Sequence, residues 1–126
     1  MVFDHLQGTP IARPNCRINV RDLYSQPTVP IEGPLDAVVV CEKFRVPDRN
    51  RLPVDEPVAQ KLLRSLTLGN TGAPPGKTCG PVYMRGPIYV RAPDTWFVVS
   101  VPTGGCGDYR HEVLRHLRSA LQWGEG

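Results

Sequence analysis

Proline and glycine limit what this chain can fold into more than any other sequence feature. Fourteen of its 126 residues are proline and twelve are glycine, together about a fifth of the chain, where an average protein has about 12%. Proline breaks helix interiors because it lacks the amide hydrogen and its ring clashes with the preceding turn. A helix bundle is therefore disfavoured, and turns and short strands must form much of the fold.

The distribution of prolines divides the chain into two parts. Residues 1–34 carry five prolines and no sustained hydrophobic periodicity, which is typical of an extended arm. A short apolar alternation around Ile18 and Val20 predicts one edge strand within it. The remainder has the length of one small domain, since domains cluster at about 100–150 residues. We therefore expect a proline-rich extended arm at 1–34 and a single domain at 35–126.

The segment 35–41 is the most clearly predicted strand. It follows Gly33 and Pro34, is rich in β-branched residues and is apolar on both alternating faces. This pattern is typical of a central strand that is buried on both sides. The segment 45–54 is polar and contains proline, which predicts a connecting loop.

Two strand-like segments, 82–91 and 96–101, form a predicted hairpin. They flank a turn in which proline takes the second position and aspartate the third, as a type I turn prefers. Folding the chain about this turn places Arg91 opposite Trp96. Pro87 cannot donate a hydrogen bond to a ladder, so a bulge or an unpaired edge is expected in the first strand.

Two amphipathic helices are predicted, one on each side of this hairpin in sequence. The first spans about 56–68, with Asp55 as the N-cap and Pro57 in the first turn, and the second spans about 109–123. Their apolar stripes consist of Val58, Ala59, Leu62, Leu63 and Leu66 in the first helix and of Val113, Leu114, Leu117, Ala120 and Leu121 in the second. The predicted fold is a small α+β domain with an antiparallel sheet covered on one face by two helices.

Four widely spaced cysteines stand at positions 16, 41, 79 and 106. Metal centres usually take their cysteines in close pairs, so a metal site is disfavoured, as is a thioredoxin-type redox pair. The hairpin register places Cys106 beside residues 81–82, within reach of a disulfide to Cys79. Cys16 would then bond Cys41 and pin the arm to the central strand. The alternative is four free thiols packed as small hydrophobic side chains.

The oxidation state of the cysteines also decides the expected location. Disulfides are typical of oxidising compartments, so a disulfide-bonded chain would be extracytoplasmic or secreted, and a chain of free thiols cytoplasmic. The N-terminal stretch has no charged start followed by an apolar region, and we expect no secretory signal in it. We also expect no membrane span, because none of the apolar runs reaches about 18 residues.

The sequence contains no recognisable catalytic motif. His111 and His116 stand five positions apart, which points them to different faces of a helix and excludes the zinc-protease motif. A cysteine nucleophile at Cys106 beside His111 is the enzymatic alternative, and it competes with the disulfide. We therefore expect a protein that is not an enzyme and that needs no cofactor and no metal.

Positive charge is concentrated in the second half of the chain. The net charge is +3, and residues 61–126 hold eight Lys and Arg against four Asp and Glu. On the final helix, His111, Arg115 and Arg118 share one face and form a possible basic patch. No aromatic platform accompanies them, so nucleic-acid binding is disfavoured.

Several of these residues match the pattern of a known family. The segment Cys79-Gly80-Pro81-Val82-Tyr83, two strands and Cys106 follow an apolar run that ends in Cys41 and a helix. This order, over about residues 35–106, resembles the subtilisin-inhibitor family and exported domains of similar layout. The resemblance implies a small α+β sandwich with two disulfides and a protease-binding loop just after a cysteine.

The resemblance also implies roles for single residues. It makes Cys79 the cysteine that anchors the protease-binding loop and Cys106 its partner, and it makes Val82 and Tyr83 the residues that follow the scissile bond. Pro81 departs from the family, because it takes the position whose side chain enters the specificity pocket of the protease. The family's other disulfide lacks a cysteine at the expected place, and the arm cysteine is the only substitute.

These observations together predict a protein-binding domain of the inhibitor type. The expected binding segment consists of Cys79, Gly80, Pro81, Val82, Tyr83, Met84 and Arg85. Two alternatives stay open. A structural or virion-type subunit would dock its arm on a neighbouring copy, and a basic nucleic-acid-binding domain would use the final helix.

Overall fold

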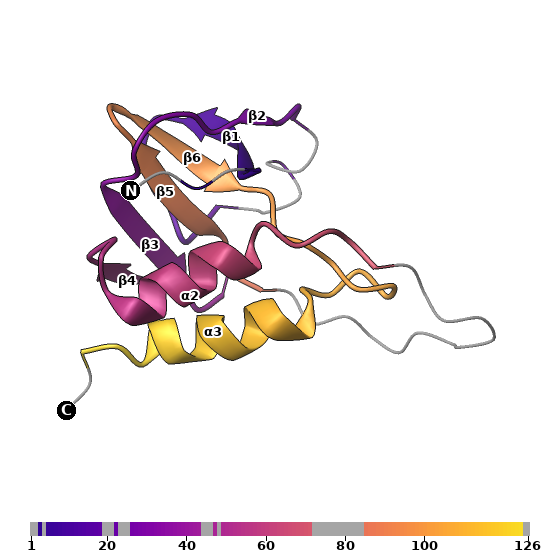
Figure 1. The fold of residues 1–126 in the computed structure, drawn as a ribbon. Coiled ribbons are helices and arrows are strands. Elements are labelled where there is room, and N and C mark those ends of the chain that lie inside the picture. Colours follow the sequence, from indigo (N-terminus) through magenta and orange to yellow (C-terminus); the bar gives the residue numbers. More distant parts are fainter. Residues whose placement is uncertain are drawn as a thin grey trace.

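The chain forms a small α+β fold (Figure 1). The structure is a computed structural model that describes residues 3, 5–18, 22, 26–43, 47, 49–71 and 85–124. In these parts of the chain, six strands form one antiparallel sheet in the order β2-β1-β6-β5-β3-β4. The elements are β1 (Gln7–Ile11), β2 (Val29–Pro30), β3 (Ala37–Cys41), β4 (Arg49–Leu52), α2 (Pro57–Ser65), β5 (Ile88–Ala92), β6 (Thr95–Val99) and α3 (His111–Leu121).

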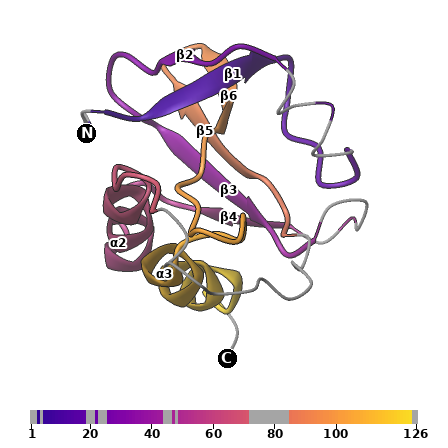
Figure 2. The same cartoon turned by 90° about the vertical axis from the view of Figure 1, so that its right-hand side faces the viewer.

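Both helices lie on the same face of the sheet (Figure 2). The apolar stripes that were predicted for them contribute the buried side chains of this layer, and those of Ala59, Leu62, Val113 and Ala120 are fully buried. They pack against alternate residues of the central strands, such as Val38 and Val40 of β3. The predicted arrangement of two helices over one face of an antiparallel sheet is confirmed.

The predicted hairpin is confirmed, with the predicted register. Arg91 pairs with Trp96 across β5 and β6. The first strand begins only at Ile88, and the part of the prediction at 82–84 lies outside the described residues. Gly86 and Pro87 precede the strand, and the Pro87 carbonyl accepts a hydrogen bond of 3.2 Å from the amide of Cys41.

The segment 45–54 is not simply a connecting loop, because it contains strand β4. This strand pairs with β3, with Leu52 opposite Val38. Leu52 is its one buried side chain. The side-chain amide of Asn50 instead donates to the carbonyls of Ala120 and Trp123 at the end of α3, at 2.8 and 3.0 Å. Strand β4 lacks the apolar alternation by which a strand is predicted, because Asn50 is polar. Its side chain instead forms hydrogen bonds with carbonyl groups at the end of α3.

The proline-rich arm contributes two strands to the sheet of its own domain. Of the edge strand predicted around Ile18 and Val20, Ile18 does not lie in a strand and Val20 lies outside the described residues. The arm contributes β1 at Gln7–Ile11 and the short edge strand β2 instead. Strand β1 lies inside the sheet between β2 and β6. A Cβ atom on Gly8 would come within 2.5 Å of the Val98 carbonyl oxygen. Glycine at this position permits close pairing but weakens the sequence signal for a strand.

Both helices are shorter than predicted, and their starts differ from the prediction. The N-cap of α2 is Glu56 rather than Asp55, and its side chain makes no capping hydrogen bond. The N-cap of α3 is Arg110, also without a side-chain cap. Asp108, two residues before this N-cap, instead forms an ion pair with Arg85.

The second face of the sheet is covered by the segment that follows β1. Cys16 forms a disulfide with Cys41 of β3, with a Cα–Cα separation of 5.5 Å. The hydroxyl of Tyr89 donates a hydrogen bond of 2.7 Å to the carbonyl of Asn15. The predicted pinning of the arm to the central strand is therefore confirmed.

Candidate functional site

Most of the predicted binding segment lies outside the described residues. This is the case for Cys79, Gly80, Pro81, Val82, Tyr83 and Met84, whereas Arg85 is described. Cys106 is disulfide-bonded. Its pairing with Cys79 stays a prediction. The site is therefore built from the residues on either side of 72–84.

Residues 102–110, which we call the base turn, form the base of the site. They connect β6 to α3. An isolated bridge joins Thr103 to Tyr109. The amide of Gly104 donates to the Asp108 carbonyl at 2.8 Å, and the amide of Gly107 donates to the Gly104 carbonyl at 3.0 Å. Gly107 has a φ of +86°, a conformation that glycine adopts without strain. The base turn is thus closed by its own backbone hydrogen bonds.

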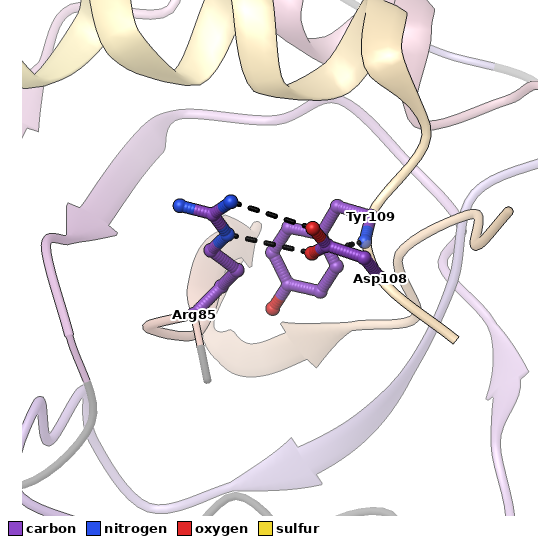
Figure 3. A network of polar contacts seen from close by, with 3 residues as sticks. All are labelled: Arg85, Asp108 and Tyr109. Carbon is purple, nitrogen blue, oxygen red and sulfur yellow. Dashed lines mark hydrogen bonds and ion pairs between the residues drawn. The ribbon is translucent and has the colours of Figure 1, made fainter. Parts of the chain in front are cut away.

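The chain that follows 72–84 is attached to this base turn by Arg85 (Figure 3). A hydrogen bond to the Gly86 carbonyl adds a second attachment. The Arg85 guanidinium donates from Nε to Oδ1 of Asp108 at 3.4 Å and from Nη2 to Oδ2 at 3.3 Å. Oδ1 of Asp108 also accepts a hydrogen bond of 2.7 Å from the amide of Tyr109. The buried hydroxyl of Tyr109 donates to the Gly86 carbonyl at 3.1 Å.

The chain that precedes 72–84 is attached to the same turn. The amide of Thr71 donates to the Thr103 carbonyl at 2.9 Å. In return, the amide of Thr103 donates to the side chain of Asn70 at 2.9 Å. The Arg110 guanidinium donates to the Gly69 carbonyl at 2.7 Å.

Arg110 is itself held in place by a neighbouring carboxylate. Its Nη2 lies 3.2 Å from Oε1 of Glu112. The hydrogen bond from Arg110 lowers the pKa of the Glu112 carboxyl, because it stabilises the charged form. Arg110 therefore serves the site as a brace between α3 and the chain before 72–84.

This geometry places the described residues that flank 72–84, Thr71 and Arg85, on one closed turn. Binding segments are commonly carried by loops that a rigid scaffold positions. Fixed ends reduce the conformational entropy that a loop loses on binding, which strengthens association. The base turn acts as a structural scaffold. It is held by an ion pair, a hydrogen bond from a tyrosine hydroxyl and backbone hydrogen bonds.

The predicted basic patch lies on one exposed face of α3. His111, Arg115 and Arg118 are all exposed, and their spacing places them on neighbouring positions of the helix surface. His116 lies apart from them and is partly buried. Burial, followed by the positive charges of Arg115 and Lys61, lowers the pKa of the His116 imidazole.

Sequence reasoning found Arg85 but missed its partners. It gave Asp108 and Tyr109 no role in a binding site. An acidic residue just before a helix has an obvious local explanation as a cap. The role of Asp108 in the site depends on its contact with Arg85, which lies 23 positions away in sequence.

Comparison with known protein families, with curated proteins and with solved structures returned no match for this chain. Within the described residues, His, Cys, Asp and Glu form no group of three or more that could hold a metal ion. The described helices include none with the length and apolar character that a membrane crossing requires.

Proposed function

We propose that this chain is a non-enzymatic protein-binding domain that binds its partner through the segment 79–85. One observation carries the proposal: residues on both sides of 72–84 are fastened to the base turn. Thr71 is attached by a backbone hydrogen bond and Arg85 by an ion pair with Asp108. Attachment of this kind is common for segments that bind a partner from a rigid scaffold.

The partner class we propose is a serine protease of the subtilisin type. The support is the resemblance of the segment around Cys79 to the protease-binding loop of the subtilisin-inhibitor family. The Cys16–Cys41 disulfide is compatible with an oxidising, extracellular location, which we propose for this domain. By this resemblance, the side chain of Pro81 would enter the specificity pocket of the protease.

The two alternative functions receive less support. The hypothesis that the arm docks on a neighbouring copy is weakened, because β1 and β2 already pair within the sheet of this chain. Nucleic-acid binding would rest on the exposed cations of α3 alone, and the described face of that helix offers no aromatic side chain for base stacking.

The experiment that tests the proposal is an inhibition assay with subtilisin. The full chain is added to the protease in stoichiometric amounts, and residual activity on a chromogenic peptide is measured. We expect inhibition by the wild-type chain and loss of inhibition in Val82→Asp. The matched control is Val29→Asp, the same change at an exposed position of β2, which should inhibit like the wild type.

Three results would contradict the proposal. The wild-type chain could leave the protease fully active, or it could be cleaved as an ordinary substrate without inhibiting. Equal inhibition by the wild type and Val82→Asp would show that the binding segment lies elsewhere. Loss of inhibition in Val29→Asp together with Val82→Asp, at unchanged thermal stability, would likewise reject 79–85 as the specific contact.

A further inference from the structure

A second surface of the molecule has the features of a peptide-binding groove. It runs along α3 beside the residues that follow β3 and precede β5, and its volume is about 270 Å³. Three leucines of α3 line it, together with Glu42, Lys43, Arg85 and Arg118. We call it the α3 groove.

The floor of the α3 groove is apolar. Leu114, Leu117 and Leu121 are spaced three and four residues apart, so they lie on one stripe of the helix. Leu117 is buried in the core, while Leu114 and Leu121 are half-buried. The two half-buried leucines therefore leave apolar surface uncovered between them.

The rim of the α3 groove is positively charged. Lys43 and Arg118 are both exposed, and neither forms an ion pair with another described residue. Glu42 is the one acidic side chain among the described lining residues. On the outer side of α3, Arg115 and His111 stand next to Arg118 on the helix surface.

The dimensions of the α3 groove fit a short peptide. From Leu114 to Leu121 the helix rises about 10 Å, the length of about three residues of extended chain. Its volume lies below the range of about 300–1,000 Å³ that is usual for small-molecule sites. The space suits a single anchoring side chain with its neighbours.

We propose that the α3 groove binds an acidic segment of a partner protein, with one large apolar side chain on the leucine floor and flanking carboxylates at Lys43 and Arg118. A nucleic acid would satisfy the cations but has no apolar side chain for the floor. The inference goes beyond the proposed function and does not rest on it. The two sites share only Arg85, and the charge reversals at Lys43 and Arg118 leave that residue unchanged.

Fluorescence anisotropy with labelled synthetic peptides tests this inference on the full chain. The probe is a short peptide of aspartate and glutamate with a central phenylalanine. Replacing that phenylalanine by glycine should weaken binding about tenfold or more, because no large apolar side chain would then be buried on the leucine floor. A peptide with lysines in place of the acids should not bind.

Charge reversals locate the site. Arg118→Glu should weaken binding of the phenylalanine probe at least about tenfold, and Lys43→Glu serves as a second variant of the same rim. The matched control is Arg64→Glu on the exposed face of α2, which should bind like the wild type.

The inference is overturned by any of three results. The phenylalanine probe does not bind; the glycine probe or a single-stranded oligonucleotide binds as tightly as it does; or Arg64→Glu weakens binding as much as Arg118→Glu. None of these outcomes depends on protease inhibition, so the two proposals fail separately.

Discussion

Removing the disulfide between Cys16 and Cys41 is expected to lower the free energy of unfolding by about 3 kcal/mol. The bond joins residues 25 positions apart, and its loss frees a loop of that size in the unfolded chain. Domains of this kind are stable by only about 5–15 kcal/mol, so the loss is a large share of the total. Urea unfolding of Cys16→Ala/Cys41→Ala, compared with the wild type, measures it.

The single variants provide the control for this prediction. Cys16→Ala and Cys41→Ala each break the same bond, so each should lose nearly as much stability as the double variant, and the effects should not add. A double variant that unfolds at the wild-type urea concentration would show that the bond does not stabilise the fold. In that case the hydrogen bond from Tyr89 to Asn15 and the apolar contacts would suffice to hold the arm.

Gly86→Ala is expected to destabilise the chain by about 1–3 kcal/mol, the usual range for an overpacked site. The added Cβ would overlap the carbonyl oxygen of Cys41 and would lie 2.7 Å from its carbonyl carbon. Both are backbone atoms of the central strand, so they cannot move aside as a flexible side chain would. The substitution forces β3 away from the chain that carries Arg85.

The matched control for Gly86→Ala is Gly69→Ala. Gly69 is exposed, and a Cβ added to it would meet nothing within 4 Å, so the change should stay within about 0.5 kcal/mol. Thermal unfolding of the two variants decides the prediction. Equal stability of Gly86→Ala and Gly69→Ala would contradict the close approach of Gly86 to β3.

The elements with clear periodicity could be predicted from the sequence. The continuous apolar run at 37–41 became the buried strand β3, and the hairpin pairs Arg91 with Trp96 as expected. Turn chemistry fixed that register, because proline and aspartate favour only certain turn positions. The apolar stripes of both helices also face the sheet as predicted.

Two of the strands that were missed or misplaced in the sequence analysis, β1 and β4, have non-local causes. Strand β4 exposes arginines and uses Asn50 to bind the end of α3. Strand β1 contains Gly8 and Pro10, residues that normally argue against a strand. In each case, the pairing partner supplies the stabilisation, and a partner distant in sequence leaves no local pattern.

The candidate site shows the same limit. Arg85 was predicted as part of the binding segment because the resemblance to an inhibitor family places a binding loop just after Cys79. Asp108 and Tyr109 were not, because their contacts with Arg85 and Gly86 cross 23 residues of chain. A contact of this kind becomes visible only when the fold brings the segments together.

The most direct test of the central claim is a double-mutant cycle on the Arg85–Asp108 ion pair, read out as the inhibition constant for subtilisin. If the base turn fixes the binding segment, Arg85→Gln and Asp108→Asn should each weaken inhibition about tenfold, and the double variant should be no weaker than either. The pair is about one-third exposed, so stability should change by less than about 1 kcal/mol. An Asp108→Asn variant that inhibits as tightly as the wild type would contradict the claim.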